Sequence, residues 1–208
     1  MLFRSLDPDS VGNGTHIHFS LLDPSGMPAL PDPSRPYGLS ELGAHFVAGI
    51  LHHLPAIAAI TAPSVASYYR LRPDRWAPTA ANLASLDRGA AIRICQGAGS
   101  EAESLARQFN VEFRVADAAA SPYLALGALV HAGLDGIRKR RAIPTAEGGG
   151  ELPKTLEAAL ALLAGCVEAK DWFGEDFLRL YLSFKRAEIR SLGGLDEREI
   201  CRRYAEVY

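Results

Sequence analysis

The chain has 208 residues, which allows one large domain or two small ones. Apolar residues make up 48% and charged residues 22% of the chain, proportions typical of globular proteins and not of disordered ones. With 22 basic and 24 acidic residues the net charge is −2, so the composition does not favour a nucleic-acid-binding protein.

The cysteines and the hydrophobic segments exclude further classes. Cys95, Cys166 and Cys201 are odd in number and form no CxxC pair, which predicts neither a disulfide framework nor a cysteine zinc site. A reducing, cytoplasmic location is therefore expected. The first residues contain no hydrophobic segment of the signal-peptide kind. No stretch is expected to reach the roughly 20 apolar residues of a membrane span, so no membrane partner is expected.

Strands and a long helix are predicted in the first half of the chain. Residues 15–21 alternate polar and apolar side chains with period two, which predicts a strand with one polar face. Ser40 is a plausible N-cap for an apolar helix, which Pro55 either interrupts or restarts. Residues 90–94 and 111–115 are also predicted strands.

The second half is predicted to be helical. Ser121 and Pro122 begin a helix that ends near Lys139, and helices are also expected over 156–164, 173–192 and 196–208. Asp196 and Glu199 have the spacing of a capping box at the start of the last helix, with Asp in place of Ser or Thr. Mixed strands and helices followed by helices alone indicate an α+β protein. Three consecutive glycines at 148–150 predict a flexible break, with a strand-containing part, 1–147, before it and a helical tail, 151–208, after it. Three visible strands are few for a sheet, which suggests part of a larger fold.

Two predicted strands carry side chains suited to metals and phosphates. His16, His18 and Ser20 share the polar face of the first strand, because alternate residues project to the same side. Glu112 and Arg114 share a face of another strand, where a carboxylate can bind Mg²⁺ or Mn²⁺ and a guanidinium can clamp phosphate. Taken alone, the histidine pattern is better explained by a polar, solvent-facing strand, and Glu112 with Arg114 is better explained by a cross-strand surface pair.

Three further arginines, Arg70, Arg88 and Arg93, lie in segments expected to be ordered or buried. A group of cations in a slightly acidic protein suggests an anionic ligand, although three separate salt bridges would explain them equally well. Together with the histidines and Glu112, they form an inventory suited to metal-assisted phosphoryl transfer. The sequence has neither a GxxxxGK[ST] nor a GxGxxG motif.

Several ordered segments at compatible spacings resemble glutamine synthetase. They are 12–21 (GNGTHIHFSL), 62–71 (APSVASYYRL), 82–93 (NLASLDRGAAIR), 112–114 (EFR), 120–126 (ASPYLAL) and 132–137 (AGLDGI). The resemblance implies activation of the γ-carboxylate of glutamate by ATP, followed by attack of an amine on γ-glutamyl phosphate. It also implies Mg²⁺ or Mn²⁺ as cofactor, glutamate, ATP and ammonia or an organic amine as partners, and a ring-shaped homo-oligomer for the full-length protein.

The resemblance assigns roles to individual residues by their position in these motifs. The metal ligands would be His16 and Glu112; glutamate binding would involve Gly12, His16, Arg70 and Arg114; the nucleotide would face His18, Ser20, Arg88 and Arg93; and the catalytic cations would be Arg70, Arg88 and Arg114.

Two departures from the family pattern qualify this expectation. Trp76 stands in the loop RLRPDRWAP where ammonia-using members carry a glutamate, and this variant is similar to ligases that join glutamate to polyamines or ethanolamine. Alternatively, Trp76 only packs the loop and ammonia is still used. The family's N-terminal β-grasp domain and the first half of its catalytic domain are expected to be absent. A non-catalytic fragment that acts as a folded binding or assembly module is therefore the alternative function.

Overall fold

A computed structural model of the chain describes residues 7–144 and 150–207. Its sheet contains β1 (Ile17–Phe19), β4 (Asn110–Phe113), β3 (Ile92–Cys95) and β2 (Leu83–Ala84), in that spatial order. The β1–β4 and β4–β3 pairs are antiparallel, whereas β2 pairs with β3 in parallel. The predicted strands are confirmed, each slightly shorter than its pattern, and the two-residue β2 was not predicted.

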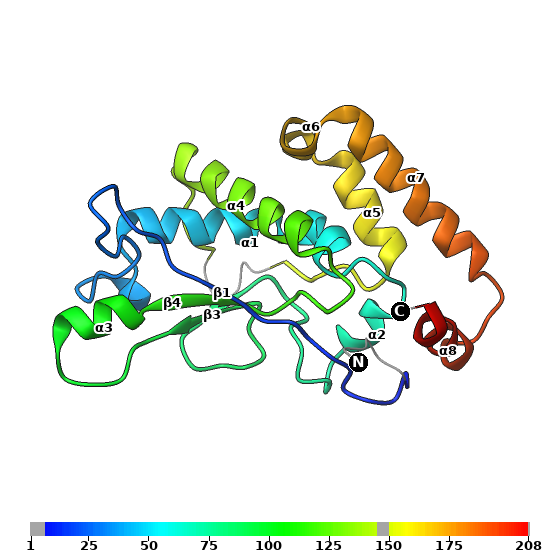
Figure 1. The fold of residues 1–208 in the computed structure, drawn as a ribbon, viewed down its shortest axis with the longest axis horizontal. Helices are drawn as coiled ribbons and strands as arrows, with labels where there is room; N and C mark the ends of the chain where they lie inside the picture. The colour runs from blue at the N-terminus through cyan, green and yellow to red at the C-terminus, as the bar shows by residue number, and fades with distance from the viewer. Residues whose placement is uncertain (1–6, 145–149, 208) are drawn as a thin grey trace.

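Two long helices, α1 (Glu41–Thr61) and α4 (Pro122–Arg138), lie side by side over one face of the sheet (Figure 1). Glycine allows their close approach: a Cβ on Gly49 of α1 would lie 2.2 Å from the carbonyl oxygen of Ala132 on α4. The apolar side chains of β3 and β4, such as Ile92 and Phe113, are fully buried in the core beneath these helices. The opposite side chains of the same strands are thereby left for a polar site.

The long helix α1 begins as predicted and continues further than predicted. The Ser40 hydroxyl caps it by accepting a hydrogen bond from the Gly43 amide. Pro55 lies inside the helix and does not end it, so the predicted interruption is wrong. Proline removes one backbone donor, and the burial of this helix in the core outweighs that local cost.

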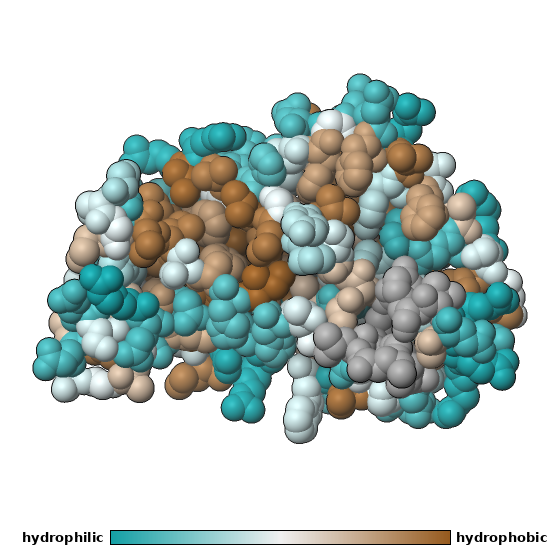
Figure 2. Space-filling model, viewed as in Figure 1, coloured by the Kyte–Doolittle hydropathy of each residue, from teal (hydrophilic) through white to brown (hydrophobic). Residues whose placement is uncertain are grey.

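By length and composition alone, α1 could cross a membrane, which corrects the expectation that no segment approaches that length. In the fold, however, 72% of its apolar window is buried inside the protein. The helix is therefore accounted for as the core helix of a globular domain. Figure 2 shows apolar side chains gathered over α1 and α4. Leu126 and Val130 of α4 are about half exposed.

The C-terminal part contains α5 (Leu156–Gly165), α6 (Val167–Phe173), α7 (Glu175–Ser191) and α8 (Glu197–Val207). Helix α5 packs on α1, and α8 packs beside α2 (Ser67–Arg70) in a second apolar cluster (Figure 1). Asp196 accepts a hydrogen bond from the Glu199 amide, which confirms its predicted role as the cap of the last helix.

The structure adds short helices that the sequence pattern did not predict. They are the 3₁₀ helix η1 (Pro36–Gly38), α2, α3 (Ala102–Gln108) and α6. The predicted glycine break at 148–150 falls almost wholly outside the described residues. The described strands all precede residue 147 and helices α5–α8 follow residue 151, but the division of the chain into two parts stays a prediction.

Candidate active site

Glu112 is the centre of a polar cluster on the face of the sheet opposite α1 and α4. Strand register places it directly between His18 of β1 and Arg93 of β3. Its carboxylate is 2.6 Å from the Nε of Arg93, 2.8 Å from the Nδ1 of His16 and 3.0 Å from the Nη1 of Arg114, and His18 lies 3.5 Å away. The tertiary fold thus joins residues that the sequence placed on separate strands.

The charge balance of this cluster favours an ionised carboxylate and a neutral imidazole. Burial acts to raise the pKa of Glu112, but the neighbouring Arg114, His16 and Arg93 outweigh it and lower the pKa. Burial lowers the pKa of His16, and the positive charge of Arg114 lowers it further, against the opposing effect of Glu112. A neutral imidazole beside a carboxylate is the protonation state that metal binding requires.

The donor set fits a divalent cation of the Mg²⁺ or Mn²⁺ type. The Oε2 atom of Glu112 is buried and makes no hydrogen bond of good geometry, although the Nε of Arg93 lies close to it. Carboxylate oxygen is a preferred ligand of such ions, and imidazole nitrogen also binds Mn²⁺. Glu112 and His16 could therefore hold a metal through groups that are already in the required form.

The structure gives Arg114 and Arg70 different surroundings. Arg114 is buried and fixed, because its Nε donates to the carbonyl of Arg88 at 3.0 Å while its Nη1 reaches Glu112. Arg70, at the end of α2, is also buried and donates to the carbonyls of Val115 and Ala116. Its Nη1 lies beside Gly14, so it approaches the cluster from the side, next to the His16 ring.

A cavity of about 810 Å³ opens over the cluster. It is lined by His16, Asp74, Trp76, Ala77, Arg88, Gly89, Arg93, Glu112 and Arg114. Five predicted site residues are therefore brought together around one space large enough for a nucleotide-sized ligand. The Trp76 side chain is 85% exposed at this cavity, and its backbone has a φ of 56°, in the left-handed region.

The remaining predicted residues do not line this cavity. His18 contacts Glu112 but is turned toward Asn110, whose Oδ1 lies 2.9 Å from its Nδ1. Ser20 is exposed beyond the end of β1, and Gly12 lies in the preceding loop with a φ of 67°. Asp74 was missed by sequence reasoning, since an aspartate in a proline-rich loop carries no local signal.

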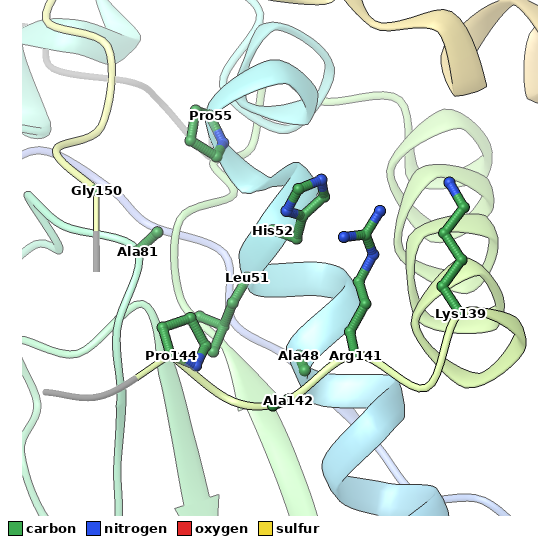
Figure 3. A pocket seen from close by; sticks show the side chains of 10 residues that line it. All are labelled: Ala48, Leu51, His52, Pro55, Ala81, Lys139, Arg141, Ala142, Pro144 and Gly150. Carbon is green, nitrogen blue, oxygen red and sulfur yellow. The ribbon is translucent and has the colours of Figure 1, made fainter. Parts of the chain in front are cut away.

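A second cavity, of about 500 Å³, lies beside α1 and the end of α4 (Figure 3). Figure 3 shows His52, Arg141 and Lys139 along one side of it. Lys139 is paired with Asp135 at 2.9 Å and with Glu168 at 2.7 Å, and Arg141 is paired with Asp135 at 3.0 Å. Because these cations are already neutralised, this cavity is a weaker candidate for phosphate binding than the one over Glu112.

Comparisons with known proteins agree with the geometry. The family model "Glutamine synthetase, catalytic domain" matches residues 6–204. The chain is 33% identical to the gamma-glutamylpolyamine synthetase GlnA3 of Streptomyces coelicolor, over 95% of this chain and 45% of that protein. It is 36% identical to the glutamine synthetase of Methanocaldococcus jannaschii, over 85% of this chain and 41% of that protein.

A solved structure described as a novel glutamine synthase homolog superposes with a TM-score of 0.92 at 41% identity, covering all of this chain and 48% of the other. The chain thus spans less than half the length of these relatives. The relatives are named synthetases, which are ligase enzymes, and the family generally uses ATP and divalent metals. The chain belongs to the glutamine synthetase catalytic-domain family.

Proposed function

We propose that this chain supplies the C-terminal part of the active site of an ATP-dependent ligase that joins the γ-carboxylate of glutamate to an amine. The observation that best supports this proposal is the buried Glu112 carboxylate, which lines the 810 Å³ cavity and is surrounded by His16, Arg93 and Arg114. A site that pairs a metal-binding carboxylate with several fixed guanidinium groups is suited to phosphoryl transfer, where positioning and charge neutralisation supply most of the catalysis.

The residues at the cavity would have different roles in binding and catalysis. Glu112 and His16 would hold Mg²⁺ or Mn²⁺, which neutralises phosphate charge when bound. Arg88 and Arg93 face the cavity and would contact the phosphates of ATP. Arg114 is held in place by the Arg88 carbonyl and would present its guanidinium to glutamate or to the transferring phosphoryl group. The roles of His18, Ser20, Gly12 and Arg70 stay predictions from motif position.

The proposed reaction has two displacements. An oxygen of the γ-carboxylate attacks the terminal phosphorus of ATP, and the bond to the ADP oxygen breaks, which gives γ-glutamyl phosphate. The amine nitrogen then attacks the carbonyl carbon, the carbon–oxygen bond to phosphate breaks, and the nitrogen loses its extra proton. The buried guanidinium of Arg114 would stabilise the negative charge that develops on oxygen in each step.

We infer an organic amine, rather than ammonia, as the acceptor. The Trp76 indole at the cavity cannot accept a proton from ammonium, but it offers an apolar and aromatic surface to the carbon chain or the cation of a larger amine. Similarity to a protein named gamma-glutamylpolyamine synthetase supports this choice, and similarity to proteins named glutamine synthetase supports ammonia as the alternative. A cytoplasmic location and a homo-oligomeric full-length protein are also proposed.

A second candidate function is a folded binding module without catalysis. Among the described residues that line the cavity, the carboxylates are Glu112 and Asp74, which is a sparse set for a reaction that uses two metal ions. Under this alternative the chain would bind nucleotide and metal and would release no phosphate.

The test is phosphate release from ATP by the purified chain with glutamate, Mg²⁺ or Mn²⁺, and either ammonium, ethanolamine or a polyamine. Glutamate-dependent release that is lost in Glu112→Gln would support the ligase, and the most effective amine would identify the acceptor. Metal-dependent ATP binding without release would favour the binding module. If an organic amine is used, Trp76→Glu should shift the preference toward ammonium and Trp76→Phe should not. An unchanged preference in Trp76→Glu would refute the argument from Trp76.

A further inference from the structure

A second group of metal-ligating side chains lies away from the Glu112 cavity, where α1 meets the junction of α5 and α6. His53 of α1, Cys166 between the two helices and Glu168 of α6 each offer one donor atom, and these atoms all lie within 4.8 Å of one another. The Cys166 Sγ is 3.9 Å from the Nδ1 of His53 and 3.7 Å from the Oε2 of Glu168. Donors around a tetrahedral zinc ion are about 3.5 Å apart, since the metal–ligand bonds measure roughly 2.0–2.3 Å.

The orientation of His53 is already that of a metal ligand. Its Nε2 lies 2.8 Å from the Oδ2 of Asp135, a carboxylate that Arg141 and Lys139 also contact. The two cations keep this carboxylate ionised, so it accepts a hydrogen bond from the Nε2–H group of His53. The Nδ1 lone pair is thereby left toward the cysteine sulfur. A histidine held through its second nitrogen by a carboxylate is the usual arrangement at zinc sites.

The two carboxylate oxygens of Glu168 have different partners. Its Oε1 accepts from the Nζ of Lys139 at 2.7 Å, and its Oε2 faces the sulfur of Cys166. His53 is buried, and the other two side chains are half-buried, so the group is enclosed yet reachable from solvent. Nitrogen, sulfur and oxygen donors together suit a borderline-soft cation, whereas Mg²⁺ prefers oxygen ligands alone.

We propose that His53, Cys166 and Glu168 bind one zinc ion, with the fourth coordination position open to water. On binding, the S–H bond of Cys166 breaks and its proton passes to solvent, while a sulfur–zinc bond forms. His53 and Glu168 contribute the lone pairs of Nδ1 and Oε2, the atoms that face the sulfur. No local sequence pattern points to this group, because His53 and Cys166 lie 113 positions apart and have no readable ligand spacing.

The site would fasten α1 of the core to the start of α6. Because the three donors come together only in the folded chain, zinc should bind the folded state in preference to the unfolded one. At a free zinc concentration 100 times the dissociation constant, the ratio of folded to unfolded chain would rise about 100-fold. The function of this zinc is therefore to hold the helical C-terminal part against the core, independently of the reaction at Glu112.

The test is titration of the purified, fully reduced chain with Co²⁺, a spectroscopic substitute for zinc. We expect one equivalent to produce a thiolate-to-cobalt charge-transfer band that Zn²⁺ then abolishes by displacement. None of the described residues that line the Glu112 cavity is a cysteine, so a metal bound there would not give this band. Cys166→Ser should remove the band, whereas Cys95→Ser and Cys201→Ser, the matched cysteine controls, should keep it.

Two further variants, Asp135→Asn and Glu168→Gln, test the site even if Cys166→Ser fails to fold. Asp135→Asn keeps all three donors and should weaken zinc binding about 10–100-fold, measured by competition with a chelator. Glu168→Gln should weaken it while leaving the thiolate band detectable at higher Co²⁺. Absence of the band in the unmodified chain, or its persistence in Cys166→Ser, would overturn the proposal.

Discussion

Neutralising the carboxylate of Glu112 should destabilise the fold far more than neutralising an exposed glutamate. Its side chain is 2% exposed. Among the described residues, its carboxylate is the one that pairs with the guanidinium groups of both Arg93 and Arg114, which are 24% and 6% exposed. Glu112→Gln removes that negative charge and leaves two partly or wholly buried cations close together. Removing one partner of a buried ion pair typically costs about 3–5 kcal/mol.

The expected loss lies at the lower end of that range. The amide oxygen can still accept a hydrogen bond from Arg114, and Arg93 can turn partly toward water. We therefore expect about 3 kcal/mol, which for a chain of this size corresponds to a fall in Tm of roughly 6–12 °C. The matched control is Glu103→Gln, because Glu103 also pairs with an arginine, Arg107, at 3.1 Å but is 73% exposed. That control should cost less than about 0.5 kcal/mol.

The assay is thermal and urea unfolding followed by circular dichroism, with a chelator present so that bound metal does not contribute to stability. The urea slope should be the same in both variants and in the unmodified chain, which shows that the denatured states are comparable. If Glu112→Gln melts no lower than Glu103→Gln, the carboxylate is not compensating the two cations, and the electrostatic account of the site is wrong.

Two further predictions concern the helices. Gly49→Ala places a Cβ 2.2 Å from the carbonyl oxygen of Ala132 and should lower the free energy of unfolding by about 3 kcal/mol or more. The control Gly127→Ala has open space around it and should raise the free energy of unfolding by up to about 1 kcal/mol. Equal urea midpoints for the two variants would contradict this prediction. Lys139 lowers the pKa of Glu168 from 4.5 to about 2, so stability present above pH 4.5 is lost as the pH falls toward 2. Glu168→Gln should flatten that part of the stability–pH curve, and an unchanged curve would refute it.

Local patterns predicted many of the elements. Period-two alternation located the strand around His18, and the capping residues Ser40 and Asp196 began their helices as expected. The short helices α3 and α6 were missed, because one turn or two carries too little periodicity to be recognised. The predicted interruption at Pro55 was wrong for a different reason. Proline usually ends a helix, but here burial of the helix in the core outweighs the local cost of the proline.

The candidate site was only partly visible in the sequence. Motif resemblance selected His16, Arg88, Arg93, Glu112 and Arg114, and the structure brings all five to one cavity. Their catalytic roles stay predictions, as do those of the residues outside the cavity. Asp74, which also lines the cavity, has no recognisable local signal in the sequence.

The sequence by itself determined the family, the polar and apolar faces of the strands and the residue types available for chemistry, because these depend on local order along the chain. The tertiary structure alone decided which of these residues meet. Strand register placed Glu112 between His18 and Arg93, and the packing of α1 against α4 and α6 joined His53 to Asp135 and the Cys166 thiol. Such contacts link residues tens of positions apart, and their geometry is set by long-range packing that no local pattern encodes.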